Sequence, residues 1–79
     1  MIDVETQERL TVRTEGDAGP YLMVPVRQLE AVQEVLKKHN ISYWTDDEAV
    51  SVDGKPEVAF VNLGPGGDAS RVQGILDAA

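Results

Sequence analysis

Two stretches of this sequence decide the fold: Tyr21-Leu22-Met23-Val24 and Val58-Ala59-Phe60-Val61, the second of which continues to Leu63. Both are apolar on both alternating faces, whereas the other segments with strand or helix periodicity are apolar on one side only. Successive side chains of a strand point to opposite faces, so such a run predicts a strand that is covered on both faces. We therefore expect the segments 21–25 and 57–63 to lie at the centre of a β-sheet.

The first half of the chain predicts one more strand and one helix. Residues 9–15 alternate, with Leu10 and Val12 on one face and polar residues on the other, which is typical of an edge strand. The glycine- and proline-containing cluster at 16–20 predicts a hairpin loop. Residues 27–39 have the periodicity of an amphipathic helix. Its apolar stripe consists of Leu29, Val32, Val35 and Leu36.

The second half predicts a strand, a turn and a closing helix. Residues 41–52 are interpreted as one strand bent at Asp46-Asp47, with two strands around a tight turn as the alternative. Asp53-Gly54-Lys55-Pro56 predicts a hairpin turn before the apolar segment that follows. Asp68 or Ser70 is expected to cap the closing helix. The apolar stripe of that helix consists of Val72, Ile75, Leu76 and Ala79.

The order of these elements predicts an α+β fold of the form ββαββα. It corresponds to a circularly permuted ferredoxin-like topology, a four-stranded antiparallel sheet with two helices on one face. The predicted strand order is 1-2-4-3, in which the segments follow one another as 9–15, 21–25, 57–63 and 41–52. Residues 1–8 are expected to form a flexible N-terminal arm, and residues 9–79 a single domain.

Two helices can cover only one face of this sheet. Under them we expect a set of alternating apolar residues: Leu10, Val12, Leu22, Val24, Val50, Val52, Val58 and Phe60. The other face would carry Tyr21, Met23, Ala59 and Val61, with Tyr43 or Trp44. Such an apolar patch is large for a monomer, so the sequence predicts an interface on this face, occupied by a second copy of the chain or by another protein.

The composition excludes several classes of function. The chain has 79 residues, a formal net charge of -7 and no cysteine. The charge argues against binding to nucleic acid or to anionic membranes, and it makes a basic protein partner electrostatically easier. The acidic start lacks the features of a signal peptide and no long apolar run is present, so we expect a cytoplasmic protein.

The Gly64-Pro65-Gly66-Gly67-Asp68 loop is the sequence feature most similar to a ligand-binding loop. It precedes a predicted helix, where backbone N–H groups can bind an anion, and Arg71 lies one turn further on. The candidate ligand-binding residues are Gly64, Gly66, Gly67 and Arg71. The loop lacks the phosphate-binding glycine patterns, and Asp68 would repel an anion, so a simple strand-to-helix turn is favoured.

No other group of residues in the sequence indicates a catalytic or metal-binding site. His39 is the only histidine of the sequence, and we expect it to interact favourably with the dipole at the C-terminal end of its helix. The acidic residues Asp46, Asp47, Glu48, Asp53 and Glu57 lack the spacing of a calcium loop. We therefore expect no catalytic residues, no metal and no cofactor.

Three hypotheses on function follow. The first is a small non-enzymatic interaction or regulatory module that self-associates through its open sheet face. The second is an acidic inhibitor or adaptor that docks on a basic protein. The third is a ligand-binding or enzymatic site formed between subunits at the Gly64–Asp68 loop.

Overall fold

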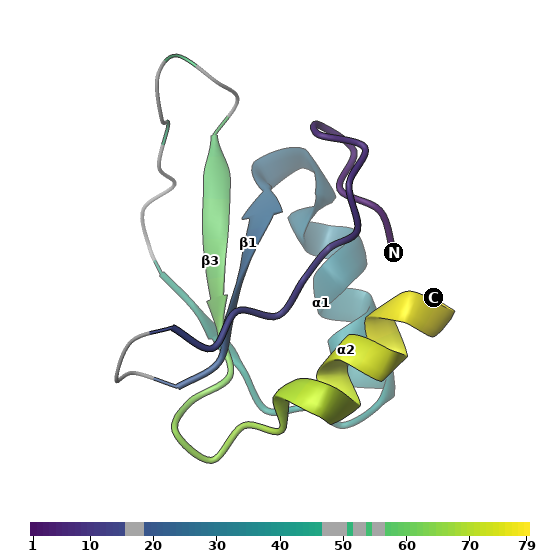
Figure 1. The fold of residues 1–79 in the computed structure, drawn as a ribbon, viewed down its shortest axis with the longest axis vertical. Coiled ribbons are helices and arrows are strands. Elements are labelled where there is room, and N and C mark those ends of the chain that lie inside the picture. The colour runs from purple at the N-terminus through teal and green to yellow at the C-terminus, as the bar shows by residue number, and fades with distance from the viewer. Residues whose placement is uncertain (16–18, 47–50, 52–53, 55–56) are drawn as a thin grey trace.

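A computed structural model describes residues 1–15, 19–46, 51, 54 and 57–79 (Figure 1). Its elements are β1 (Tyr21–Pro25), η1 (Val26–Gln28), α1 (Leu29–Lys38), β2 (Trp44–Thr45), β3 (Val58–Asn62) and α2 (Ala69–Ala78). Three sequence predictions fall largely outside the described residues: the hairpin loop at 16–20, the second half of the 41–52 strand with Val50 and Val52, and the turn at 53–56.

The described strands form an antiparallel sheet in the order β1-β3-β2. β1 pairs with β3 along its whole length, from Tyr21 opposite Asn62 to Pro25 opposite Val58. β2 pairs with the end of β3, where Trp44 lies opposite Asn62. The two doubly apolar segments are therefore neighbours in the sheet.

Both helices pack on one side of this sheet, as Figure 1 shows for the β1–β3 pair. The α1 helix buries Val32 and Leu36, and α2 buries Val72 and Leu76. These four side chains form one apolar core with residues of the sheet and of the N-terminal segment. The other buried members of that core are Leu10, Val12, Leu22, Val24, Val61 and Leu63.

The helix ends follow from local sequence signals. Asn40 has a φ of 57°, and the N–H of Ile41 donates to the carbonyl of Leu36 at 2.9 Å, which closes the end of α1. At the start of α2 the side chain of Asp68, rather than that of Ser70, caps the helix by accepting from the backbone N–H of Arg71. Among the described residues, no helix is long and apolar enough to cross a membrane.

The predicted four-stranded ββαββα sheet is wrong, although the fold is mixed α+β. Residues 9–15 form only one bridge to β1, between Arg13 and Tyr21. The backbone of the same segment also bonds to Gln73 on α2, whose Oε1 accepts from the N–H of Val12 at 2.8 Å and whose Nε2 donates to the carbonyl of Leu10 at 3.0 Å. Arg13 directs its own N–H and carbonyl to Tyr21, so the groups bound by Gln73 belong to the edge of the segment that faces away from β1. This segment therefore buries its two apolar side chains, as an edge strand would, while part of its backbone is bound by a helix side chain.

Gln28 binds the first residues of the chain in the same way. Its Nε2 donates to the carbonyl of Ile2 at 2.7 Å, and its Oε1 accepts from the N–H of Val4 at 3.0 Å. Gln28 is buried, which satisfies the rule that buried amides find partners. Residues 1–8 thus form a docked turn, closed by a bridge between Ile2 and Arg9. The division of the chain into a flexible arm of residues 1–8 and a single domain of residues 9–79 stays a prediction.

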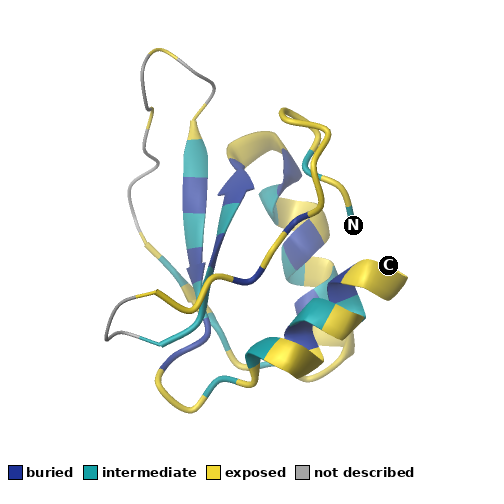
Figure 2. Ribbon diagram, in the orientation of Figure 1, coloured by how far each residue is buried: buried dark blue, intermediate teal, exposed yellow. Residues whose placement is uncertain are grey.

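The predicted faces of β1 and β3 need one correction. Leu22 and Val24 lie in the core as expected, but they are opposite Val61 and Ala59, and directly opposed residues share a face. Ala59 and Val61 are therefore buried under the helices, and Val58 and Phe60 lie on the other face. The alternation of buried and intermediate residues along β3 is visible in Figure 2. A one-residue shift in register moves every side chain of a strand to the opposite face.

Candidate interaction surface

The side of the sheet that faces away from both helices is the candidate functional surface, and we call it the open face. The strand register assigns its members, because residues directly opposite one another point to the same side. They are Arg13, Tyr21, Met23, Trp44, Asp46, Val58, Phe60 and Asn62; Pro25, opposite Val58, shares this side but is fully buried. Of the interface residues predicted from the sequence, this set retains Tyr21, Met23 and Trp44, and it loses Ala59 and Val61 to the core.

The open face is organised in rows that run across the strands. One row carries, in order, Arg13, Tyr21, Asn62 and Trp44. The next row contains Met23 opposite Phe60, and the N–H of Asp46 donates to the carbonyl of Phe60 at 3.3 Å. Arg13 and Trp44 therefore lie at opposite ends of the same row.

The centre of the open face is apolar and partly exposed. Met23, Val58 and Phe60 are half-buried, whereas Leu22 and Val61 on the covered face have no exposure. The rings of Tyr21 and Phe60 contact each other with centroids 6.2 Å apart and planes tilted by 42°. Aromatic pairs of this kind present a rigid apolar area at low entropic cost.

Trp44 is the most exposed large apolar residue of the open face, at 51%. A Cβ added to Gly64 would lie 3.1 Å from the Cζ3 atom of the Trp44 ring, so the indole packs closely over that glycine. The φ of Gly64 is +79°, a second reason for glycine at this position. Tyr43, the alternative predicted for this face, packs against the core instead.

Two opposite charges flank the apolar centre. Arg13 is exposed beside Tyr21, at the β1 edge. Asp46 lies at the β2 edge, where its Oδ1 accepts a hydrogen bond from Nδ2 of Asn62 at 3.2 Å. The described part of the open face thus carries one positive and one negative side chain, although the whole chain has a net charge of -7.

The N-terminal turn borders the open face along β1. Between them lies a cleft of about 220 Å³ whose lining includes Met23, Val58, Arg9 and Thr11. Arg9 is held at this edge by Asp77 of α2, with Nε donating to Oδ1 at 2.8 Å. The two hydrogen-bonded groups form an ion pair that lowers the pKa of Asp77 to about 2, because Arg9 stabilises the ionised carboxylate.

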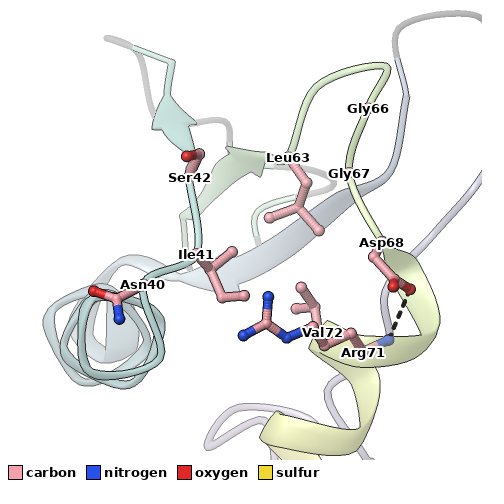
Figure 3. Close-up of a pocket in the computed structure, with 9 residues that line it drawn as sticks. All are labelled: Asn40, Ile41, Ser42, Leu63, Gly66, Gly67, Asp68, Arg71 and Val72. Carbon is pink, nitrogen blue, oxygen red and sulfur yellow. Dashed lines mark hydrogen bonds between the residues drawn. The ribbon is translucent and has the colours of Figure 1, made fainter.

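The predicted ligand loop lies at a different place, beside a cavity of about 400 Å³ between the end of α1 and the start of α2 (Figure 3). Gly66, Gly67 and Arg71 line it, and Gly64 lies under Trp44 instead. The remaining lining residues are Asn40, Ile41, Ser42, Leu63, Asp68 and Val72.

The two charged groups of this cavity, Asp68 and Arg71, already have partners within the chain. The carboxylate of Asp68 accepts from the N–H of Arg71 at 3.0 Å and so occupies the helix terminus that an anion would need. The guanidinium of Arg71 donates to the carbonyl of His39 at 3.3 Å. In the described part of the chain, no buried side-chain polar atom lacks a partner. The arrangement is that of a strand-to-helix turn, and it does not favour an anion site.

Metal-binding residues are not gathered anywhere in the ranges that the structure describes. Within 1–15, 19–46, 51, 54 and 57–79, no group of three or more histidine, cysteine, aspartate or glutamate side chains could hold an ion. Asp47, Glu48 and Asp53 of the acidic segment lie outside those ranges. His39 is exposed at the end of α1.

Sequence reasoning missed Arg13, Asp46, Val58 and Phe60 as members of the open face. One signal could have identified two of them. Asn62 is the polar residue of the otherwise apolar segment 58–63, and a polar residue favours the solvent side. Residues 58, 60 and 62 share a face, so this asparagine points to Val58 and Phe60 as open-face residues.

Comparison of the chain with known protein families, with curated proteins and with solved structures finds no match.

Proposed function

We propose that this protein is a small interaction module that associates with a second copy of itself through the open face. The observation that carries the proposal is the apolar centre formed by Met23, Phe60 and Val58 on the side of the sheet that the helices leave uncovered. Trp44 and Tyr21 flank this centre, and aromatic residues of this kind are frequent hot spots of protein interfaces.

The charge distribution favours a second copy over a basic partner. Docking on a basic protein would call for an acidic surface, yet the described open face has one arginine and one aspartate at opposite edges. A surface with both charges can complement itself, because each end can meet the opposite end of the other copy. The acidic inhibitor or adaptor inferred from the net charge would therefore need another surface.

The size of the open face indicates a weak association. Its strands have five residues in β1 and in β3, which corresponds to a length of about 17 Å. Stable interfaces bury about 800 Å² on each partner, and smaller ones are typical of transient contacts. We therefore expect a reversible dimer with a Kd above about 1 µM.

A dilution series followed by two-dimensional amide NMR tests the proposal. Self-association through the open face predicts concentration-dependent shifts in β1, β2 and β3, and much smaller shifts on the outer side of α1. Shifts confined to the helices, or none up to about 1 mM, would rule the proposal out.

A salt series distinguishes self-association from docking on a basic partner. Two copies with a net charge of -7 repel each other, so screening should leave self-association unchanged or make it stronger. Affinity for a basic protein should instead fall as salt rises. A dimer that dissociates steeply with added salt would argue against an apolar interface.

A further inference from the structure

We infer how the two copies pair: their open faces stack on each other, and a two-fold axis parallel to the strands relates them. Arg13 of each copy then lies on the Trp44 ring of the other copy, beside the Asp46 carboxylate of that copy. This inference rests on the proposed self-association and adds to it which residues meet. It follows from the row in which Arg13 and Trp44 lie at opposite ends.

Arg13 differs from the other arginines of the chain. The guanidinium of Arg9 is bound by Asp77, that of Arg27 by Glu5, and that of Arg71 by the carbonyl of His39. In the described part of the chain, the hydrogen bonds of Arg13 are made by its backbone, to Tyr21, and its guanidinium has no acceptor. An exposed arginine without an intrachain partner, at the edge of an apolar face, is suited to contact another chain.

Trp44 offers the matching surface. Its ring packs on Gly64 on one side and is 51% exposed. A guanidinium stacks favourably on an indole face, and tryptophan is the best aromatic partner for a cation. The Asp46 carboxylate lies next to Trp44 on the same edge and would add an opposite charge to the contact.

Symmetry selects between two aligned arrangements of stacked sheets. A two-fold axis perpendicular to the strands would place each edge over the same edge of the other copy, so that the two Arg13 edges would meet each other and the two Asp46 edges would meet each other. A two-fold axis parallel to the strands exchanges the edges and brings Arg13 over the Trp44–Asp46 edge, twice per dimer. Like charges in contact are destabilising, so the parallel axis is favoured.

Charge reversal tests this geometry, with the dimer Kd from sedimentation as the measurement. R13E and D46R should each raise the Kd by about tenfold, because each places like charges in both symmetric contacts. The double variant R13E/D46R should recover a Kd within about threefold of the unaltered chain. Mixing the two single variants should yield a heterodimer that is tighter than either homodimer. Urea denaturation of each variant serves as the folding control.

The outcomes separate this inference from the proposal on which it rests. If the unaltered chain is monomeric, the proposed self-association fails. If the chain dimerises but R13E and D46R bind as tightly as it does, the pairing of Arg13 with the Trp44–Asp46 edge is wrong. Additive weakening in the double variant would also overturn it.

Discussion

The side-chain amide of Gln73 binds the backbone beside Val12 as a neighbouring strand would. Its Oε1 accepts from the N–H of Val12, and its Nε2 donates to the carbonyl two residues earlier, at 2.8 and 3.0 Å. Backbone groups at a sheet edge can otherwise pair with another chain. In this protein a helix residue satisfies them, on the edge of the N-terminal segment that faces away from β1, while Leu10 and Val12 are buried in the core.

Truncation of Gln73 should therefore destabilise the protein. Q73A leaves one backbone donor and one acceptor without their partners, and we expect a loss of about 1–3 kcal/mol in the free energy of unfolding. The matched control is Q33A on α1, an equally half-buried glutamine for which the described residues provide no hydrogen bond. Urea denaturation compares the two variants. Equal losses would show that the Gln73 hydrogen bonds do not contribute to stability.

The Arg9–Asp77 ion pair predicts a dependence of stability on pH. Because its hydrogen bonds to Arg9 lower the pKa of Asp77 from 3.8 to about 2, the folded state favours the ionised carboxylate. The stabilisation is fully present above pH 3.8 and is lost as the pH falls through 2. Carboxyl NMR titration should show a depressed pKa for Asp77 in the unaltered chain and a higher pKa in R9Q, in which the hydrogen bond from Gln73 to Asp77 remains. An Asp77 that titrates near pH 4 in the unaltered chain contradicts the pairing.

The assignment of the two faces of β3 predicts that the same substitution at its two valines, Val58 and Val61, changes the free energy of unfolding by different amounts. V61T places a hydroxyl in the apolar core, where Val61 has no exposure, and should cost about 1–3 kcal/mol. V58T makes the same change in the same strand on the half-buried open face, and its cost should stay below about 0.5 kcal/mol. Thermal or urea unfolding measures both. The reverse ranking would restore the face assignment made from the sequence.

Two glycines should respond in opposite ways to alanine. Gly74 lies inside α2 with open space around an added Cβ, so G74A should stabilise the protein by about 0.5–1 kcal/mol. Gly19 has a φ of +92°, and a Cβ there would lie 2.4 Å from the carbonyl oxygen of Gly64. G19A should therefore be strongly destabilising. Stabilisation by G19A would contradict this close approach of the two chain segments.

The helices and the pairing of the two doubly apolar segments could be predicted from the sequence, because these signals are local and periodic. The stripe that includes Val32 and Leu36 identified α1, and the turn residues around Asp68 located the start of α2. Segments 21–25 and 57–63 pair because their apolar surfaces are best covered together.

The fourth strand and the face of β3 could not be predicted from periodicity. Residues 9–15 alternate as a strand does, but they form a single bridge to β1, and two of their backbone groups bond to Gln73, 61 residues after Val12, a contact that no local pattern reveals. In β3 both faces are apolar, so the apolar residues do not fix the register, and Asn62 is the one residue of 58–63 whose polarity indicates it. Because of this ambiguity, the sequence analysis placed Ala59 and Val61 on the open face, which is wrong, and did not identify Phe60 as an open-face residue.

Sedimentation equilibrium of W44D beside V26D, up to about 1 mM, tests the self-association through the open face most directly. Trp44 and Val26 are both exposed apolar residues, at 51% and 43%, but only Trp44 lies on the open face. The unaltered chain and V26D should approach twice the monomer mass as concentration rises, and W44D should remain monomeric. A monomeric unaltered chain, or equal masses for W44D and V26D, would contradict the account.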